Sequence, residues 1–264
     1  MSRLANTFSK LKTQGRAALI SYVVAGDPNQ KIGQDILDSL PASGVDIIEL
    51  GIPFTDPMAD GPTIQAADIR ALNAGMTLKK TLDLVRAFRL KDQTTPIVLM
   101  GYYNPVYIYG GVKFSTDASE AGVDGVLLVD LPPEEDGEIK GELKNVGIDL
   151  IRLITPTSTG GRLKKLVKDT SGFLYYVSIA GVTGTTSIDV SSVAEKLKEI
   201  RDVSDLPIAV GFGIRTVEDA KAVSKIADGV VIGSAFVNII EKTIENQCVS
   251  EISRAAKSYA DALA

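Results

Sequence analysis

Eight short apolar runs, separated by stretches with helical spacing, are the feature that most limits how this chain can fold. The runs are rich in Val, Ile and Leu and apolar on both faces, as parallel strands covered by helices must be. They lie at 18–24, 47–50, 97–100, 126–129, 150–154, 173–177, 208–210 and 230–232. A glycine at or near the start of four of them, Gly44, Gly122, Gly147 and Gly229, predicts a preceding helix C-terminus with positive φ.

Helical patterns fill the intervals between these runs. Apolar residues recur at helix spacing over 78–88 and 193–200, and Thr216-Val-Glu-Asp219 has the form of a capping box. Alternating strands and helices with short loops require right-handed parallel crossovers, so eight units favour an α/β fold closed into a (β/α)8 TIM barrel. An open doubly wound parallel sheet is the structural rival. The length of 264 residues suits one barrel of about 250 residues.

Two helices are expected beyond the eight-unit pattern. One is an extra N-terminal helix over Arg3–Leu11, and the other is an extra short helix over Ala235–Ile240, before the last barrel helix. No linker or change of composition divides the chain, so residues 1–264 are expected to form a single TIM-barrel domain.

Composition excludes several classes of function. The net charge is −5 and the acidic residues are not clustered, which argues against nucleic-acid binding. No apolar run approaches the ~20 residues of a membrane span. One cysteine, Cys248, and no signal-peptide pattern predict a cytoplasmic protein. Because the chain has no histidine, Ser-His and Cys-His pairs and His-ligated metals are impossible, and no metal site is expected. No predicted strand carries the lysine that Schiff-base aldolase chemistry needs.

An acidic loop follows the second predicted strand. Glu49 ends an apolar run, and Gly51 and Pro53 then lead into a loop holding Asp56 and Asp60. A buried carboxylate without a partner costs several kcal/mol, so Glu49 either caps a turn, pairs with an arginine, or serves a site. The loop-forming residues Gly51 and Pro53, and the further acid Asp60, favour a functional site in which carboxylates are the acid–base groups.

Two further groups of residues meet at the same predicted barrel end. Glycines after the last three strands suit a phosphate, since barrels commonly bind phosphate after strands seven and eight. These glycines are Gly181, Gly184, Gly211, Gly213 and Gly233, the last followed by Ser234. Arg215, just after Gly213, is as compatible with a place on the surface as with a place in the site. An apolar and aromatic set predicts a slot for a flat apolar group, and consists of Tyr22, Met100, Tyr102, Leu127, Tyr175 and Phe212.

These motifs resemble the tryptophan synthase alpha chain family. The resemblance rests on Glu49-Leu-Gly-Ile-Pro-Phe-Thr-Asp-Pro-Met-Ala-Asp-Gly-Pro62, Met100-Gly-Tyr-Tyr-Asn-Pro105, Asp130-Leu-Pro-Pro133, Tyr175-Tyr-Val-Ser178, Gly181-Val-Thr-Gly184 and Gly211-Phe-Gly-Ile214, and runs from the N-terminal helix to the end of the chain. It implies retro-aldol cleavage of indole-3-glycerol phosphate to indole and glyceraldehyde 3-phosphate in tryptophan biosynthesis.

The resemblance also implies roles for individual residues. Glu49 would be the general acid–base and Asp60 the acceptor of the indole N–H. Tyr175 and Thr183 would line the site, and Tyr22, Met100, Leu127 and Phe212 would hold the indole. Tyr102 is expected among the substrate-binding residues. Phosphate would bind at Gly184, Gly213, Gly233 and Ser234.

No cofactor is implied for this chain itself. The family works as an alpha2-beta2 heterotetramer with a beta chain that carries pyridoxal phosphate. Pro53, Asp56 and the segment 104–110, including Asn104 and Pro105, would face that partner.

Departures from the family pattern are modest. Thr55, Met58 and Met100 preserve the chemistry of the residues more common there, whereas Ile179 and the polar segment 185–188 replace versions that carry Arg. The differences at Ile179 and 185–188 affect the contacts that close the loop after strand six. The alternatives are a stand-alone lyase that releases free indole, a non-catalytic activating subunit, or another phosphate-binding barrel such as an isomerase of aromatic amino-acid synthesis or a pentose-phosphate epimerase.

Overall fold

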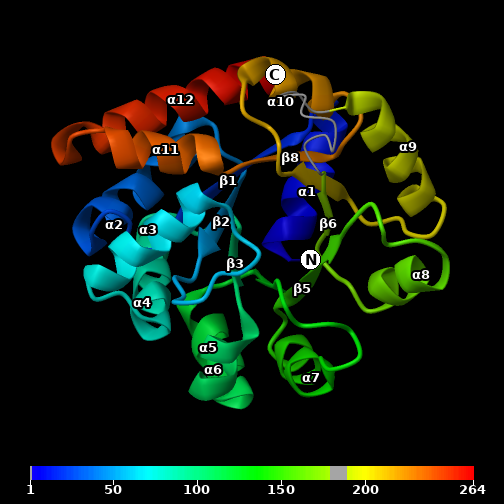
Figure 1. The fold of residues 1–264 in the computed structure, drawn as a ribbon, viewed down its shortest axis with the longest axis horizontal. Coiled ribbons are helices and arrows are strands. Elements are labelled where there is room, and N and C mark those ends of the chain that lie inside the picture. Colours follow the sequence, from blue (N-terminus) through cyan, green and yellow to red (C-terminus); the bar gives the residue numbers. More distant parts are fainter. Residues whose placement is uncertain (1, 179–188) are drawn as a thin grey trace.

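Eight parallel strands form a closed barrel in this computed structural model, which describes residues 2–178 and 189–264 (Figure 1). Each strand pairs with its neighbours in chain order, and β1 pairs with β8 to close the sheet. The TIM-barrel prediction is therefore confirmed. The strands are β1 (Ala18–Val24), β2 (Ile47–Gly51), β3 (Ile97–Gly101), β4 (Gly125–Leu128), β5 (Asp149–Ile154), β6 (Leu174–Val177), β7 (Ile208–Gly211) and β8 (Gly229–Ile232).

Helices surround the barrel (Figure 1). The Thr216–Asp219 capping box is present at the start of α10. The helices are α1 (Arg3–Gln14), α2 (Gln30–Ser39), α3 (Pro62–Asn73), α4 (Leu78–Arg89), α5 (Tyr103–Tyr109), α6 (Gly111–Ala121), α7 (Gly137–Asn145), α8 (Gly160–Lys168), α9 (Val190–Arg201), α10 (Val217–Ser224), α11 (Ser234–Lys242) and α12 (Cys248–Leu263), with 3-10 turns η1 (Pro41–Ser43) and η2 (Glu245–Gln247). None of these described helices is long and apolar enough to cross a membrane.

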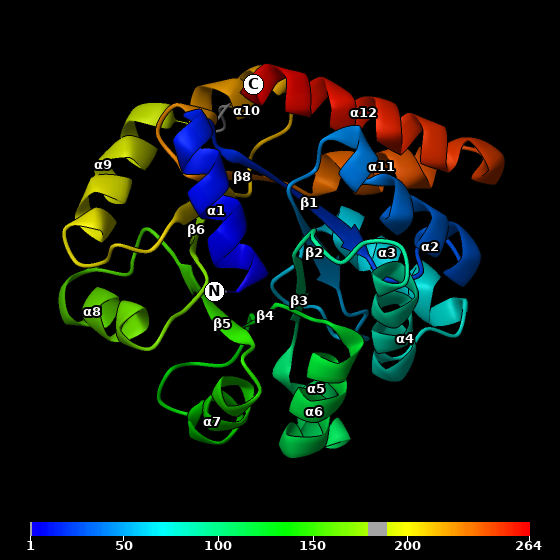
Figure 2. The same ribbon diagram turned by 180° about the vertical axis from the view of Figure 1, so that it is seen from behind.

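Both predicted additional helices are present. The N-terminal one, α1, lies across the barrel end from which the strands start, in front of the strands in Figure 2 and behind them in Figure 1. Its Phe8 ring packs 5.6 Å from the Phe173 ring, next to β6. The second, α11, precedes α12 and begins at Ser234, with only Gly233 between it and the end of β8. The α1 helix thus closes the amino end of the barrel and leaves the carboxyl end for a site.

The glycine pattern predicted before four strands is confirmed for three of them. Gly44, Gly122 and Gly147 have φ of 91°, 92° and 75°. Gly229 is different, because it is the first residue of β8 and has no positive φ. A Cβ there would lie 3.1 Å from a methyl of Ile20 and 3.2 Å from the Cβ of Ala209, so Gly229 allows close packing inside the barrel.

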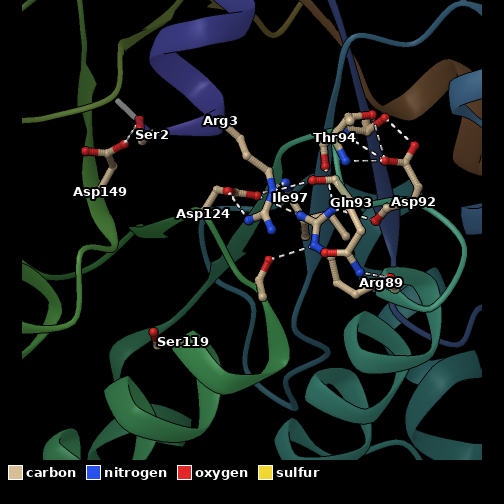
Figure 3. A network of polar contacts seen from close by, with 12 residues as sticks. Ser2, Arg3, Arg89, Asp92, Gln93, Thr94, Ile97, Ser119, Asp124 and Asp149 are labelled. Carbon is tan, nitrogen blue, oxygen red and sulfur yellow. Dashed lines mark hydrogen bonds and ion pairs between the residues drawn. The ribbon is translucent and has the colours of Figure 1, made fainter.

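Aspartates at the starts of strands fasten the amino end. Asp124 Oδ2 accepts from the Arg89 guanidinium at 2.7 Å, and its Oδ1 accepts from Arg3 of α1 at 2.9 Å (Figure 3). Asp149 receives a 3.1 Å hydrogen bond from the Ser2 hydroxyl (Figure 3). The same device recurs: Asp46, Asp124 and Asp228 accept from the backbone N–H of Leu19, Ile97 and Ile208 on the preceding strand at 2.9, 2.8 and 2.9 Å.

Candidate active site

A cavity of about 750 Å³ occupies the carboxyl end of the barrel. Side chains at the ends of β1, β2, β3, β6 and β8 form its floor, and the loops after β2, β7 and β8 form its walls. The lining residues are Tyr22, Glu49, 59–64, Met100, Tyr175, Val177, Ser178, 212–215, Val231, 233–235 and Asn238. Segments distant in sequence therefore meet at one concave surface, which is where TIM barrels carry their active sites.

Glu49 is the most unusual group in the cavity. It lies in β2 beside Tyr22 of β1, is 1% exposed, and neither carboxylate oxygen has a hydrogen-bond partner among the described residues. Burial, with a smaller contribution from the Asp60 charge, raises the pKa of Glu49 to about 8. Within the described residues Glu49 neither caps a turn nor pairs with an arginine. Its pKa suits proton transfer near neutral pH.

Asp60 stands at the edge of the same cavity and is oriented by Tyr102. The Tyr102 hydroxyl donates to Asp60 Oδ2 at 2.8 Å and accepts from the Ala59 N–H at 2.9 Å. The Gln65 amide donates to the Asp60 carbonyl at 2.8 Å, which ties the loop to α3. Burial raises the pKa of Asp60, and the Tyr102 hydrogen bond opposes that rise because it stabilises the ionised form.

Two glycines at strand ends make room for two cavity tyrosines. A Cβ on Gly51 would lie 2.5 Å from the Tyr22 hydroxyl, and a Cβ on Gly211 would lie closer still to the Tyr175 hydroxyl. Burial raises the pKa of both tyrosines, so both hydroxyls stay neutral and able to donate near neutral pH. The absence of a side chain at Gly51 and Gly211 therefore leaves the space that the two tyrosine hydroxyls occupy.

A turn after β7 and the start of α11 also line the cavity. Phe212 has a φ of 67°, in the left-handed region that a bulky residue rarely adopts, and Gly213 follows with 76°. The Ser178 hydroxyl donates to the Phe212 carbonyl at 2.6 Å and holds this turn in place. Ser234 begins α11, and a helix N-terminus attracts anions through its free N–H groups and its dipole.

The structure brings together most of the predicted site residues that it describes. Glu49, Asp60, Tyr22, Met100, Tyr175, Phe212, Gly213, Gly233 and Ser234 all line the cavity. Leu127 does not, because it is fully buried in β4 beside Met100. Tyr102 does not either, since its hydroxyl is turned to Asp60 and its ring lies against Phe54. Gly181, Thr183, Gly184 and the departures at 179 and 185–188 lie outside the described residues.

The residues predicted to face a partner differ in exposure. Asp56 and Asn104 are exposed and Pro105 is half-buried, whereas Pro53 is buried in this chain. Pro53 follows Ile52, whose backbone N–H bonds the Met100 carbonyl at 2.8 Å, so the loop is still held against β3 at that point.

Sequence reasoning missed a buried acid whose charge interacts with that of Asp60. Asp68 is 3% exposed on α3, where burial first, and the charges of Asp60 and Asp27 next, raise its pKa to about 8. The signal was available, because Asp68 shares the buried face of α3 with Ala67 and Ala71. Arg215, whose place the sequence left open, lines the cavity next to Gly213.

The acids of this region do not form a metal centre. Among residues 2–178 and 189–264, no group of three or more Asp, Glu or Cys side chains could hold a metal ion. Glu49 and Asp60 share their cavity with aromatic and apolar side chains instead. The arrangement suits proton transfer to and from an organic substrate.

Comparison with known proteins gives a consistent relationship. The family model described as tryptophan synthase alpha chain matches residues 8–263. Tryptophan synthase subunit alpha from Legionella pneumophila str. Paris is similar, with 38% identity, a TM-score of 0.93, and coverage of 100% of this chain and 98% of that one. A tryptophan synthase structure from M. tuberculosis in an aminoacrylate-bound form shows 32% identity, a TM-score of 0.90 and full coverage of both chains. The chain therefore belongs to the tryptophan synthase alpha chain family, with that family's lyase role in tryptophan synthesis.

Proposed function

We propose that this chain cleaves indole-3-glycerol phosphate into indole and glyceraldehyde 3-phosphate. The observation that carries the proposal is Glu49, a buried carboxylate with no hydrogen-bond partner among the described residues and with a pKa of about 8. A retro-aldol cleavage needs one group that can both remove and deliver a proton near neutral pH. In this cavity Glu49 fits that need best.

The two carboxylates divide the chemistry. Glu49 removes the proton from the side-chain hydroxyl next to the indole ring and delivers a proton to the ring carbon that bears the side chain. The bond between that ring carbon and the hydroxyl-bearing carbon breaks, and the latter becomes the aldehyde of glyceraldehyde 3-phosphate. Asp60, oriented by Tyr102, accepts the indole N–H and stabilises the positive charge that develops on the ring.

The cavity also matches the two ends of this substrate. Tyr22, Met100 and Phe212 offer apolar surface for an indole ring. Gly213 and the start of α11 offer backbone N–H groups for a phosphate. Thr183 and Gly184 remain proposed contacts that lie outside the described residues.

A beta-chain partner belongs to the same proposal. Met58, Tyr107, Ile108 and Val112 are large apolar residues that remain exposed, Met58 at 82%, close in sequence to Asp56 and to Asn104–Pro105. An apolar patch of this kind marks a protein interface. We expect an alpha2-beta2 complex in the cytoplasm, with pyridoxal phosphate in the beta chain and no cofactor in this one.

The test is release of indole from indole-3-glycerol phosphate by the purified chain, with and without a tryptophan synthase beta chain. We expect turnover that depends on Asp60 and rises when the beta chain is added. Asp60→Asn should lower turnover about a hundredfold, because a neutral amide stabilises the ring cation far less. Asp83→Asn, the same change on the outer face of α4, is the matched control. No indole from the wild-type chain under either condition would refute the proposal.

A further inference from the structure

Arg215 holds a special position among the charged residues of the cavity. The described lining residues include two acids, Glu49 and Asp60, and one basic residue, Arg215. Arg215 follows the turn formed by Phe212 and Gly213, and Gly233 and Ser234 line the same cavity. The cation is thus grouped with the backbone N–H groups that suit an anion.

The backbone of Arg215 is fixed at both of its polar groups. Its N–H donates to Asp219 Oδ2 at 3.2 Å, and its carbonyl accepts from the hydroxyl of the buried Tyr259 at 3.0 Å. Oδ2 of the neighbouring acid, Asp219, also accepts from the Thr216 N–H in the capping box. The neighbouring Ile214 is 3% exposed and anchors the turn. These contacts set where the side chain starts, while the side chain itself is exposed.

We propose that Arg215 determines specificity by binding the phosphate group of the substrate with its guanidinium. The inference rests on the proposed function, and it adds a side-chain cation to the phosphate contacts that backbone N–H groups provide. A guanidinium presents two parallel N–H groups that match two phosphate oxygens, and a charge-assisted pair of this kind is stronger than a neutral hydrogen bond.

The experiment compares Arg215→Gln and Arg215→Lys with the wild-type chain. With indole-3-glycerol phosphate, Arg215→Gln should raise KM about tenfold and leave kcat within about twofold, since the phosphate is bound equally before and during bond cleavage. The KM of Arg215→Lys should lie between those of the wild-type chain and Arg215→Gln, because an ammonium keeps the charge but loses the paired hydrogen-bond geometry. Arg254→Gln removes an exposed arginine on α12 and is the matched control.

A substrate without phosphate separates recognition from structure. With indoleglycerol lacking the phosphate, wild type and Arg215→Gln should show equal kcat/KM, and salt should weaken only the wild-type preference for the phosphorylated substrate. A KM unchanged in Arg215→Gln, or an equal loss with both substrates, would overturn the inference.

Binding of inorganic phosphate, measured by calorimetry, tests Arg215 without the reaction. Its dissociation constant should rise about tenfold in Arg215→Gln, and an unchanged constant counts against the inference. If the wild-type chain releases no indole, the proposed function fails, while this measurement still decides the role of Arg215.

Discussion

At the amino end of the barrel Asp124 has two arginines and a backbone N–H, whereas at the carboxyl end Glu49 has no hydrogen-bond partner among the described residues. Both carboxylates are almost fully buried, at 6% and 1% exposed. Asp46 repeats the first pattern with a bidentate pair to Arg16 at 2.7 and 2.8 Å. Asp68 resembles Glu49 more closely, because burial raises its pKa as well.

The difference shows which end is built for stability and which for chemistry. A paired carboxylate keeps its charge, fastens a strand start and cannot easily exchange a proton. An unpaired buried carboxylate destabilises the fold but holds its proton near neutral pH, as acid–base catalysis requires.

The largest effect is expected from Glu49→Gln. Turnover of indole-3-glycerol phosphate should fall about a thousandfold, about 4 kcal/mol, because an amide cannot carry the proton. Affinity for inorganic phosphate should survive, since the proposed phosphate contacts are Gly213, the start of α11 and Arg215. Glu120→Gln, an exposed change on α6, is the control. Substantial turnover remaining in Glu49→Gln would remove Glu49 from the role of acid–base.

Asp124→Ala probes the amino end. It leaves the buried Arg89 without its carboxylate and the Ile97 N–H without an acceptor. We expect the free energy of unfolding in urea to fall by about 3 kcal/mol, while the folded fraction keeps its kcat. Asp83→Ala breaks an exposed pair with Arg86 on α4 and should change stability by less than about 1 kcal/mol. Equal losses for the two variants would show that the network at the amino end is not special.

Asp68→Asn should stabilise the chain. Between about pH 4 and pH 8 the unfolded chain has lost the Asp68 proton and the folded chain has kept it, so stability falls as pH rises through this window. Asparagine has no proton to lose, so the advantage of the variant should grow from pH 5 to about 2 kcal/mol at pH 8. Solvent screening and changes in the protonation of Asp60 and Asp27 make this stability difference smaller than the raised pKa of Asp68 alone would give. Urea unfolding at both pH values measures it, and a difference independent of pH would contradict the assignment.

The sequence predicted the barrel well because the signal is local. Parallel strands buried on both faces are short apolar runs, so all eight strands were placed within about two residues. The role of the repeated aspartates was not predictable in the same way. Asp124 bonds the N–H of Ile97, 27 positions earlier, and such a partner is known only once the strand register is known.

The site was predicted through its strand ends and less well through its loops. Glu49, Tyr22 and Tyr175 follow from strand position, since the ends of parallel strands meet at one barrel opening. Leu127 pairs with the cavity residue Met100 but is fully buried and does not line the cavity, and Tyr102 turns toward Asp60. Such differences depend on side-chain direction and on neighbouring loops, which a single sequence does not encode locally.

The smallest effect is expected from Tyr102→Phe, which tests the donor that orients the cavity carboxylate of Asp60. The change removes the hydrogen bond to Asp60 and the acceptor for the Ala59 N–H, at about 1 kcal/mol, so turnover should fall about fivefold. Since that bond stabilises ionised Asp60, its loss should raise the pKa of Asp60 and move the acidic limb of the kcat/KM profile to higher pH.

Tyr107→Phe, an exposed change on α5 assayed without a beta chain, controls for the loss of a hydroxyl. A fall in turnover with an unmoved acidic limb would mean that Tyr102 only supports the loop. A shifted limb would mean that Asp60 works as an anion tuned by a single neutral donor. In that case the cavity controls the charge of Asp60 through a hydroxyl group, whereas Asp124 at the amino end is held by arginines, because arginine would hold the ionised form too firmly for proton exchange.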